Sequence, residues 1–554
     1  MKITQKQRLT GLLAFALSSL SMTAASADNV YLNQWGFTPK QNKLAVIANA
    51  SPAPFTVTRL NDGAQPLSGN TQPSGTWDDA GMRVSLADLS AITTPGEYRL
   101  SVDGAEPVIF TVKSDPYGAL HDAAIKAYYY NRAGMALDQA FAGKWHRAAG
   151  HPDTQTLILG EPDAAPTDRS KGWYDAGDYN KYIVNSGIST YTLLRAYLDN
   201  TEFYNSRHWN IPESTNERAD LLDEILWNLD WMITMQDSDG GVFHKLTTLN
   251  FSGPVMPEAA TATRYATAKS TAAALNFAAV MSVAARVFDE RRDEYLSRAD
   301  RALAWAKANP ARYYTNEDNV KTGQYGDNAL SDEHTWAAIE YAISRQDADR
   351  LAELTSSLSG VSTPSWANVT GLSYLSLLRD AKALLTDSDY KAISSRFTRF
   401  TDQQVAIMEA NAFRVPAVTK DFVWGSNAVM MNKAMLLENA FALTGKQAYR
   451  TAALALLDYV GGRNPTGYSF VTGFGINSPR FIHHRPSEAD GIADPVPGWL
   501  AGGPQNGHQD GCQYSSDLPA TSYLDDWCSY STNEITINWN APLVYVLASV
   551  ISDN

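Results

Sequence analysis

The sequence predicts a mainly α protein in which a small all-β sandwich precedes a ring of helical hairpins. Short alternating apolar segments fill the stretch from Val30 to Val112, and about twelve longer segments with helical apolar spacing follow Ser114. At 554 residues the chain exceeds what one hydrophobic core usually supports, so several domains are expected. We expect a signal peptide over 1–27, a β-sandwich domain over 28–113 and a helical domain over 114–554.

The N-terminus has the residue order of a signal peptide. Three basic residues, Lys2, Lys6 and Arg8, precede an apolar run, and the small residues of 25–27 follow it. Without this segment the formal charge changes from 45 − 59 = −14 to 42 − 59 = −17, which argues against nucleic acid or an anionic membrane as partner. We therefore expect an exported protein, periplasmic or secreted, that acts on a neutral substrate.

Apolar and polar residues alternate in four short segments of the first domain, 43–48, 55–60, 96–102 and 108–112. Turn residues such as Asn61-Asp62-Gly63 and Asp103-Gly104 separate the segments. This pattern predicts an antiparallel sandwich of Ig-like size, roughly 85 residues. The segment holds no pair of acids suited to chemistry.

Helical spacing dominates the second domain. The segments lie near 117–141, 181–199, 217–236, 266–288, 292–308, 332–345, 347–357, 371–385, 388–409, 425–444, 446–461 and 533–551. Six pairs of helices suggest a toroid, with the alanine-rich segment 266–287 as an inner helix. Connections rich in glycine, proline and aromatic residues would form the rim that carries an active site.

Two carboxylates, Asp175 and Asp178, stand at the centre of the most unusual stretch, 173–182. Gly177 is expected to allow a tight turn, and helical spacing follows at once, so the acids lie on a loop entering a helix. Asp178 could simply cap that helix. Aromatic side chains on both sides favour a sugar-binding site instead: Trp173, Tyr174, Tyr179 and Tyr182.

Two late segments could join this pair of acids. Segment 469–485 is rich in glycine and aromatic residues and ends in His483, His484 and Arg485, whose donors suit sugar hydroxyls. A surface loop with incidental basic residues is the alternative. Segment 523–541 places Glu534 among aromatic residues, where apolar surroundings raise a carboxyl pKa toward that of a general acid. The alternative is a capping box over 531–534, in which Glu534 only stabilises a helix start.

The chain has two cysteines, Cys512 and Cys528. In an exported protein a disulfide between them is expected, and the loop-entropy model gives it about 3 kcal/mol. A zinc site built from both cysteines and His508 is the alternative, although the spacing does not support it.

Together the acid pair and the two late segments resemble glycoside hydrolase family 9, whose members are inverting β-1,4-glucanases with an (α/α)6 barrel. Segment 469–485 matches the histidine signature of the family, 523–541 matches its aspartate/glutamate signature, and 175–178 matches its catalytic-base motif. The opening of the first domain, 30–37, resembles the Ig-like module that precedes the barrel in one large subgroup.

The resemblance implies residue roles. It makes Asp178 the general base that activates water, Asp175 its partner in holding that water, and Glu534 the general acid. Inversion requires room for water, so the acid and base carboxyls should lie roughly 6.5–9.5 Å apart. Residues expected to line the sugar site are His483, Arg485 and Asp525, and Trp424 is expected to stack on a sugar ring, with a buried core tryptophan as the alternative.

The resemblance also bears on metals. Family members commonly hold calcium near a motif like 325–333, in which Asp332 and Glu333 would be ligands; acids at a helix start are the alternative. Some relatives carry zinc near Arg132 and His151. This sequence has Ala133 and Gly150 at the cysteine positions, so zinc is not expected. No organic cofactor is expected.

The sequence thus predicts a monomeric, exported hydrolase of β-1,4-glucan, whether cellulose, a related β-glucan or cello-oligosaccharides. One alternative is an exo-β-glucosaminidase acting on chitin-derived oligosaccharides, which would need to recognise a 2-amino or 2-acetamido group. Another is a non-hydrolytic carbohydrate-binding protein. Products from cellopentaose and chitobiose separate these possibilities.

Overall fold

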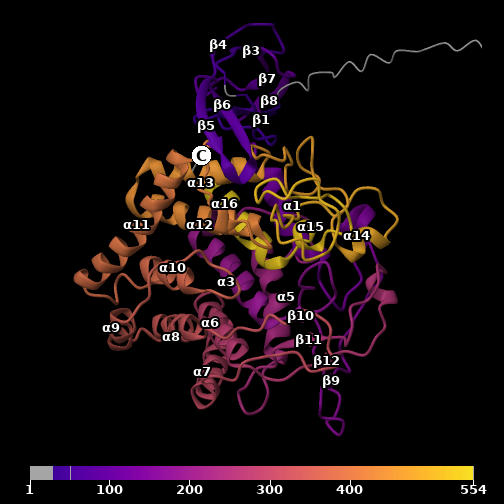
Figure 1. Cartoon of the computed structure of the whole chain (residues 1–554). Helices are drawn as coiled ribbons and strands as arrows, with labels where there is room; N and C mark the ends of the chain where they lie inside the picture. The colour runs from indigo at the N-terminus through magenta and orange to yellow at the C-terminus, as the bar shows by residue number, and fades with distance from the viewer. Residues whose placement is uncertain (1–28, 50, 553–554) are drawn as a thin grey trace, which may run out of the picture.

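The computed structural model describes residues 29–49 and 51–552, so the expected signal peptide lies outside the described residues. A β-sandwich forms a separate lobe on top of a larger helical body (Figure 1). One of its sheets has the order β1-β2-β6-β5 and the other β4-β3-β7-β8, with all neighbours antiparallel. The strands are β1 (Val30–Tyr31), β2 (Leu44–Ile47), β3 (Pro54–Arg59), β4 (Leu67–Asn70), β5 (Gln72–Trp77), β6 (Met82–Asp88), β7 (Gly96–Val102) and β8 (Val108–Val112).

The alternating pattern places its apolar side chains between the two sheets. Val57 and Leu100 on one sheet and Ala45 and Ala87 on the other are completely buried in one apolar cluster. Burial of one face of each strand is the physical meaning of the period of two in the sequence.

Twelve longer helices in the described residues alternate along the chain between an outer and an inner ring. Each inner helix contacts the next, and the last contacts the first, which closes an (α/α)6 barrel. The inner helices are α3 (Ile183–Asp199), α6 (Thr271–Val287), α8 (Ser331–Arg345), α10 (Thr370–Asp380), α12 (Ser426–Thr444) and α16 (Ile537–Ser552). The outer helices are α1 (Gly118–Tyr130), α5 (Asp220–Thr234), α7 (Arg292–Ala308), α9 (Ala348–Ser356), α11 (Asp387–Ala410) and α13 (Gln447–Val460).

The alanine-rich helix α6 is an inner helix, which confirms its expected position. Its alanines at 273, 274, 278 and 279 are fully buried, and small side chains let α3, α7 and α8 pack closely around it. The helix begins at Thr271 rather than near 266, because the Ser270 side chain caps it by accepting from the Ala273 amide. The segment before it forms a strand.

A small sheet on the barrel was not predicted. It has the order β10-β11-β12-β9, and its strands are β9 (Leu157–Ile158), β10 (Lys181–Tyr182), β11 (Lys245–Thr247) and β12 (Tyr265–Ala266). Strands of two or three residues carry too little periodicity to be recognised in a sequence. The sheet brings the loop before α3 beside the segment 248–265.

Short elements complete the described chain. The helix expected over 117–141 ends at Tyr130, and a separate turn of helix follows it. The short helices are α2 (Gln139–Ala142), α4 (Thr201–Asn205), α14 (Arg485–Ala489) and α15 (Tyr530–Asn533), with 3₁₀ turns at Asp78–Ala80, Gly143–Trp145, Pro257–Ala259, Asp289–Arg291 and Thr419–Asp421. In the described part of the chain, every helix is too short or too polar to cross a membrane.

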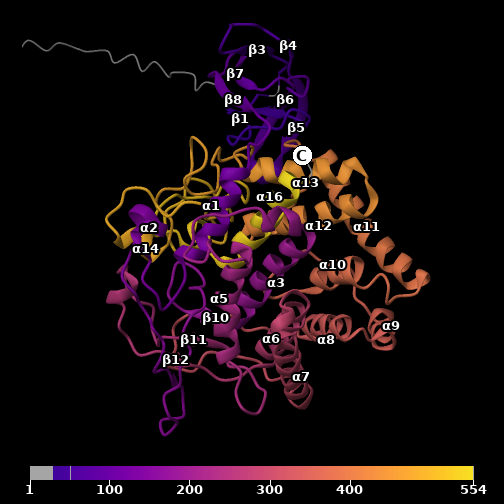
Figure 2. The ribbon, with the colours of Figure 1, turned by 180° about the vertical axis from the view of Figure 1, so that it is seen from behind.

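The sandwich rests on α13 and on the segment that follows it, as both views show (Figures 1 and 2). The Asn33 amide donates to Asp458 Oδ1 at 2.8 Å, and the Trp35 indole donates to Ser469 Oγ at 2.8 Å. The backbone amide of Gln34 donates to the Gly461 carbonyl at 2.9 Å. These bonds anchor the first module directly to the segment that leads toward His483.

Candidate active site

The loop before α3 holds Asp178 with donors from its own residues. The backbone amide and the side-chain amide of Asn180 donate to Asp178 at 3.1 and 2.7 Å, and the Tyr182 hydroxyl donates at 3.2 Å. Helix α3 has Tyr182 as its N-cap and no side-chain cap. The helix-capping alternative for Asp178 is therefore wrong, since its carboxylate bonds to loop residues and remains 6% exposed.

Asp175 lies deeper than Asp178 and is 1% exposed. The Asn185 amide donates to both of its carboxyl oxygens at 2.9 and 3.0 Å, and the Tyr325 hydroxyl donates to Oδ2 at 3.2 Å. Burial, and then the charge of Asp178, raise the pKa of Asp175 well above its ordinary value. The barrel interior therefore fixes this carboxyl through helix α3 and the segment before α8.

The four aromatic residues of this stretch are not sugar platforms, which corrects the sequence interpretation. All four are buried, Tyr179 at 4% exposure being the most accessible. The Trp173 indole donates to Glu224 at 2.7 Å, and the Tyr179 hydroxyl donates to the Val255 carbonyl at 2.6 Å. These side chains hold the loop in place from beneath, while sugar would have to meet other rings.

Gly177 is needed for a different reason than the expected tight turn. It is not among the residues with positive φ, so its backbone is one that other residues could adopt. Its Cα instead packs against the backbone of His483, and its carbonyl accepts from the Arg485 amide at 3.1 Å and from Arg485 Nη1 at 2.7 Å. The acid pair and the histidine segment are thus joined at this glycine.

Glu534 follows the short helix α15 rather than starting one. Its backbone is extended, at φ −73° and ψ 161°, so the capping-box alternative is wrong. Glu534 forms an isolated β-bridge with His483. Two residues further along the chain, Thr536 forms a second isolated bridge with Ala176, in the loop of the acid pair. Burial raises the pKa of Glu534 well above its usual value, the charges of Asp178 and Asp175 raise it further, and Arg485 opposes them. The late Glu534 therefore shares one site with the early pair Asp175 and Asp178.

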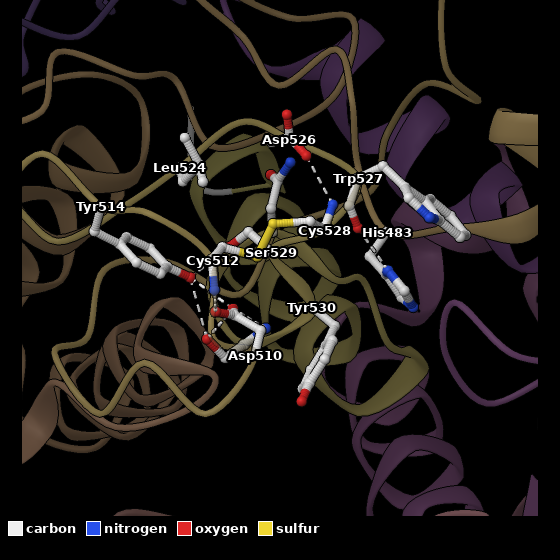
Figure 3. The surroundings of a disulfide bond; sticks show 12 residues. His483, Asp510, Cys512, Tyr514, Leu524, Asp526, Trp527, Cys528, Ser529 and Tyr530 are labelled. Atoms are coloured by element: carbon white, nitrogen blue, oxygen red, sulfur yellow. Dashed lines mark hydrogen bonds between the residues drawn. A yellow bond between two sulfur atoms is a disulfide. The ribbon is translucent and has the colours of Figure 1, made fainter.

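Aromatic rings border this site on the side of Glu534. The His483 ring stacks on Trp527 with centroids 4.2 Å apart, and Tyr530 meets it at 5.8 Å (Figure 3). Trp424 lies 5.4 Å from Tyr530 and is 42% exposed, so the core-tryptophan alternative is wrong. Exposed ring faces beside carboxylates suit a pyranose.

Arg485 and Asp525 have their polar groups engaged with the protein. Arg485 Nε donates to the Ser252 carbonyl at 2.9 Å. Asp525 accepts from the backbone amides of Arg480 and Phe481 at 2.9–3.1 Å, and from the Asn533 side chain at 2.9 Å. In this arrangement Asp525 secures the segment that presents His483.

The two cysteines, Cys512 and Cys528, are joined, with Cα atoms 6.2 Å apart. The disulfide lies between the His483–Trp527 stack and a polar cluster around Asp510, whose carboxylate accepts from the Tyr514 hydroxyl at 2.6 Å (Figure 3). The third residue of the alternative zinc site, His508, stacks on Tyr514 and bonds Ser522 at 2.6 Å.

The expected metal residues have distinct surroundings. Both oxygens of Glu333 are buried without a hydrogen-bond partner, and so is Oδ2 of Asp327. Burial and the neighbouring Asp332 and Asp327 raise the pKa of Glu333 to about 10. Over the described residues, no three His, Cys, Asp or Glu side chains are arranged to hold a metal ion. Unsatisfied carboxyl oxygens still fit a hard cation by their donor chemistry.

Hydrogen bonds occupy the place where relatives would carry zinc. His151 Nδ1 bonds the Tyr174 hydroxyl at 2.9 Å, and Ala133 packs with Tyr174 and Tyr179 in one apolar cluster. Burial lowers the pKa of His151 to about 3, so its ring is neutral near pH 7.

Sequence reasoning missed the residues that position the acids. Asn180 lies inside the stretch 173–182, and in the sequence its amide is not distinguishable from that of a turn residue. Asn185 follows Asp178 by seven residues within α3, and Tyr325 is separated from Asp175 by 150 positions. Such a long-range contact depends on closure of the barrel.

Family models match both the sandwich and the helical part of the chain. The family model described as Glycosyl hydrolase family 9 matches residues 117–547, and that of the Cellulase N-terminal ig-like domain matches 25–107. A xyloglucan-specific endo-β-1,4-glucanase of Bacteroides ovatus is 40% identical, over 99% of this chain and 98% of that protein. Endoglucanase D of Acetivibrio thermocellus is 32% identical, over 99% and 88%.

Solved structures are similar over nearly the whole chain. The structure titled Bacteroides ovatus GH9 superposes with a TM-score of 0.88 at 38% identity, covering 94% of this chain and 98% of the other. AaCel9A in complex with cellobiose-like isofagomine gives a TM-score of 0.87 at 31% identity, covering 94% and 99%.

Proposed function

Because the chain belongs to glycosyl hydrolase family 9, we propose that it is an endo-β-1,4-glucanase that cleaves glucan by a single displacement with inversion. Asp178, Asp175 and Glu534 carry the chemistry, and no organic cofactor takes part. The observation that supports this most directly is the meeting of Glu534 with the Asp178 loop, where the charges of Asp178 and Asp175 add to burial in raising the pKa of Glu534.

Asp178 acts as the general base. Its carboxylate accepts a proton from a water molecule while the oxygen of that water attacks the anomeric carbon from the face opposite the leaving group. Asn180 and Tyr182 orient the carboxylate through the bonds described above. Asp175, held by Asn185 and Tyr325, positions the water from below.

Glu534 acts as the general acid. Its raised pKa keeps the carboxyl protonated at pH values where an ordinary glutamate is ionised. The proton passes to the glycosidic oxygen as the bond to the anomeric carbon breaks, so the leaving chain departs as a neutral alcohol. Water supplies the new hydroxyl, and the new reducing end is the α-anomer.

The sugar next to the scissile bond rests among His483, Arg485 and Trp424. The exposed Trp424 supplies a stacking face, supported by Tyr530 at 5.4 Å. Asp525 supports the sugar site indirectly. Its carboxylate accepts from the backbone amides of Arg480 and Phe481 and so fixes the segment that carries His483. Cellulose, soluble β-glucans and cello-oligosaccharides share the backbone that this site would bind. We also propose branched glucan of the xyloglucan kind as a substrate class, since one relative at 40% identity is xyloglucan-specific.

Several further properties belong to this proposal. Residues 28–113 form the Ig-like domain and 114–554 the catalytic domain, and the protein is exported as a monomer after removal of 1–27. Glu333, with Asp332 and backbone carbonyls, holds a structural calcium ion, an assignment supported by its two unpaired buried oxygens.

Product analysis on a cello-oligosaccharide series tests the reaction, with the anomer read by NMR immediately after cleavage. Release of internal fragments with α-configured new ends is expected. Formation of β-anomers would exclude inversion, and removal of single residues from one chain end would exclude endo action. Cleavage of chitobiose in place of cellopentaose would favour the glucosaminidase alternative, and binding without turnover would favour a carbohydrate-binding protein.

A further inference from the structure

A recess of about 500 Å³ opens beside Asp178, between the catalytic loop and the segment 248–265. Its lining includes Asp178 and Asn180 of the catalytic loop, and Thr248, Asn250, Phe251 and Thr263 of the facing segment. Its size is that of a small ligand site. Glu534, the exposed Trp424 and the half-buried Trp527 are not among its lining residues, so the recess is separate from the aromatic residues on the side of Glu534.

The walls of the recess are fixed to the catalytic machinery. The Tyr179 hydroxyl holds the Val255 carbonyl at 2.6 Å, and Arg485 Nε holds the Ser252 carbonyl at 2.9 Å. Asn180 Oδ1 accepts from the Thr248 amide at 3.2 Å, while the Asn180 side-chain amide donates to Asp178. The same residues that orient the base and approach the sugar therefore set the shape of the recess.

The chemistry of the lining suits a neutral, hydroxyl-rich ligand. Hydroxyls and amides line it, no lysine or arginine does, and its histidine, His151, is neutral near pH 7. At its rim Phe251 is 46% exposed, with the Arg485 guanidinium 5.5 Å from its ring centroid. A flat apolar face beside hydroxyl and amide groups is a common sugar-binding arrangement. The carboxylate of Asp178 disfavours an acidic sugar.

Resting on the proposed function, we propose that this recess is a subsite for a neutral sugar branch, carried by a glucosyl unit next to the scissile bond. Because the backbone of the glucan runs past Glu534 and the aromatic rings, a side branch is the part of a substrate that enters a lateral recess. Branched β-1,4-glucans then gain contacts that linear chains do not make, and the recess sets the preference between them.

Gly253 lines the recess and offers a position at which the recess can be narrowed. A Cβ added at this residue meets no atom within 4 Å, and its φ is not in the left-handed region. Gly253→Trp therefore adds a large side chain to the lining of the recess without a clash at its Cβ. Gly360→Trp is the matched control, because Gly360 has the same freedom and lies between α9 and α10, away from the recess.

The experiment compares kcat/KM on xyloglucan oligosaccharides and on unbranched cello-oligosaccharides of equal backbone length. Gly253→Trp should lower the ratio of branched to linear kcat/KM by about tenfold or more, whereas Gly360→Trp should leave the ratio as in the wild type. Binding of both ligands to the Glu534→Gln protein, with and without Gly253→Trp, provides a readout independent of turnover.

Three outcomes would overturn the subsite. An unchanged ratio in Gly253→Trp would show that branches do not enter the recess. Cleavage of linear chains by the wild type without cleavage of branched ones would remove the subsite and leave the proposed function intact. Cleavage of neither substrate would remove the proposed function, and the subsite with it.

Discussion

Gly177 and His483 pack so closely that a Cβ built on residue 177 would lie 1.9 Å from the His483 carbonyl oxygen. The contact joins two segments that are more than three hundred residues apart, the loop of the acid pair and the segment of the proposed sugar-binding residues. Because the neighbour is backbone rather than the end of a flexible side chain, an added methyl group could be accommodated only by moving one segment.

Gly177→Ala should therefore separate the base from the sugar-binding residues. We expect overpacking to lower the free energy of unfolding by about 1–3 kcal/mol. We also expect kcat to fall about 100-fold, because a displacement of the base by about 1 Å relative to the bound sugar is enough to misalign the reacting groups. Gly360→Ala, at a glycine with open space around it, is the control. Turnover of Gly177→Ala near that of the wild type would show that the contact does not set the geometry of the site.

The roles of the acid and the base can be separated by the leaving group. Glu534→Gln should lower turnover of cello-oligosaccharides by about 10²–10⁴-fold, because the departing alkoxide is no longer protonated. Dinitrophenyl β-cellobioside releases a stable phenolate and needs no acid, so the variant should retain most of its activity on it. Asp178→Asn should be impaired on both substrates, since water activation is required in each.

Circular dichroism and steady-state kinetics of the two variants provide the measurement. Equal losses on both substrates in Glu534→Gln would contradict its role as the general acid. Retention of activity on either substrate in Asp178→Asn would contradict the role of the base.

The sequence patterns predicted the inner and outer helices closely, because long amphipathic segments carry many repeats of their period. Helix α12, expected over 425–444, is observed over Ser426–Thr444. The strands β9 to β12 could not be predicted, since two or three residues define no period. The pairing of helices into a closed ring was inferred from their number, and its closure depends on contacts that a single sequence does not specify.

The site was less predictable in its supporting residues than in its acids. Signature motifs identified Asp178 and Glu534 as candidates, but local aromatic content misled about their neighbours. Tyr179 and Tyr182 resemble sugar platforms in the sequence, yet the barrel buries them. The sequence shows that an aromatic residue is close to an acid along the chain. It does not show whether the ring of that residue is exposed to solvent or buried.

Calcium should stabilise the protein through Glu333. Excess calcium should raise the melting temperature of the wild type relative to EDTA, by an amount corresponding to about 2.7 kcal/mol at 100 times the dissociation constant. Glu333→Gln should lose this increase. In EDTA it should unfold at a similar temperature to the wild type, because burial already keeps the Glu333 carboxyl neutral and its pKa is raised to about 10.

Glu353→Gln, at an exposed position of α9, is the matched control for the loss of one carboxylate. An equal increase in melting temperature with calcium in the wild type, Glu333→Gln and Glu353→Gln would show that calcium binds at a site that does not include Glu333. Absence of any effect on the wild type would contradict the calcium proposal.

Asp458 makes the contact between sandwich and barrel sensitive to pH. It is 3% exposed and accepts from Asn33 at 2.8 Å and from Gln41 at 3.2 Å. Burial raises its pKa to about 6, and the charges of Arg463 and Lys43 oppose the shift in part. The folded protein therefore holds a proton on this carboxyl over a pH range in which the unfolded chain, with a pKa near 3.8, has released it.

A folded pKa above the unfolded pKa gives a stabilisation that is complete below the unfolded value and is lost as pH rises through the folded one. Between pH values of about 4 and 7, the wild type should lose up to about 3 kcal/mol relative to Asp458→Asn, which does not titrate. Thermal melts of both proteins across this range measure the difference, and the common titration of other carboxyls cancels. Asp79→Asn, which removes a carboxylate of the sandwich outside this cluster, provides the control for the loss of one charge. A constant difference between the wild type and Asp458→Asn would mean that the interface keeps Asp458 ionised, with Arg463 and Lys43 compensating its burial completely.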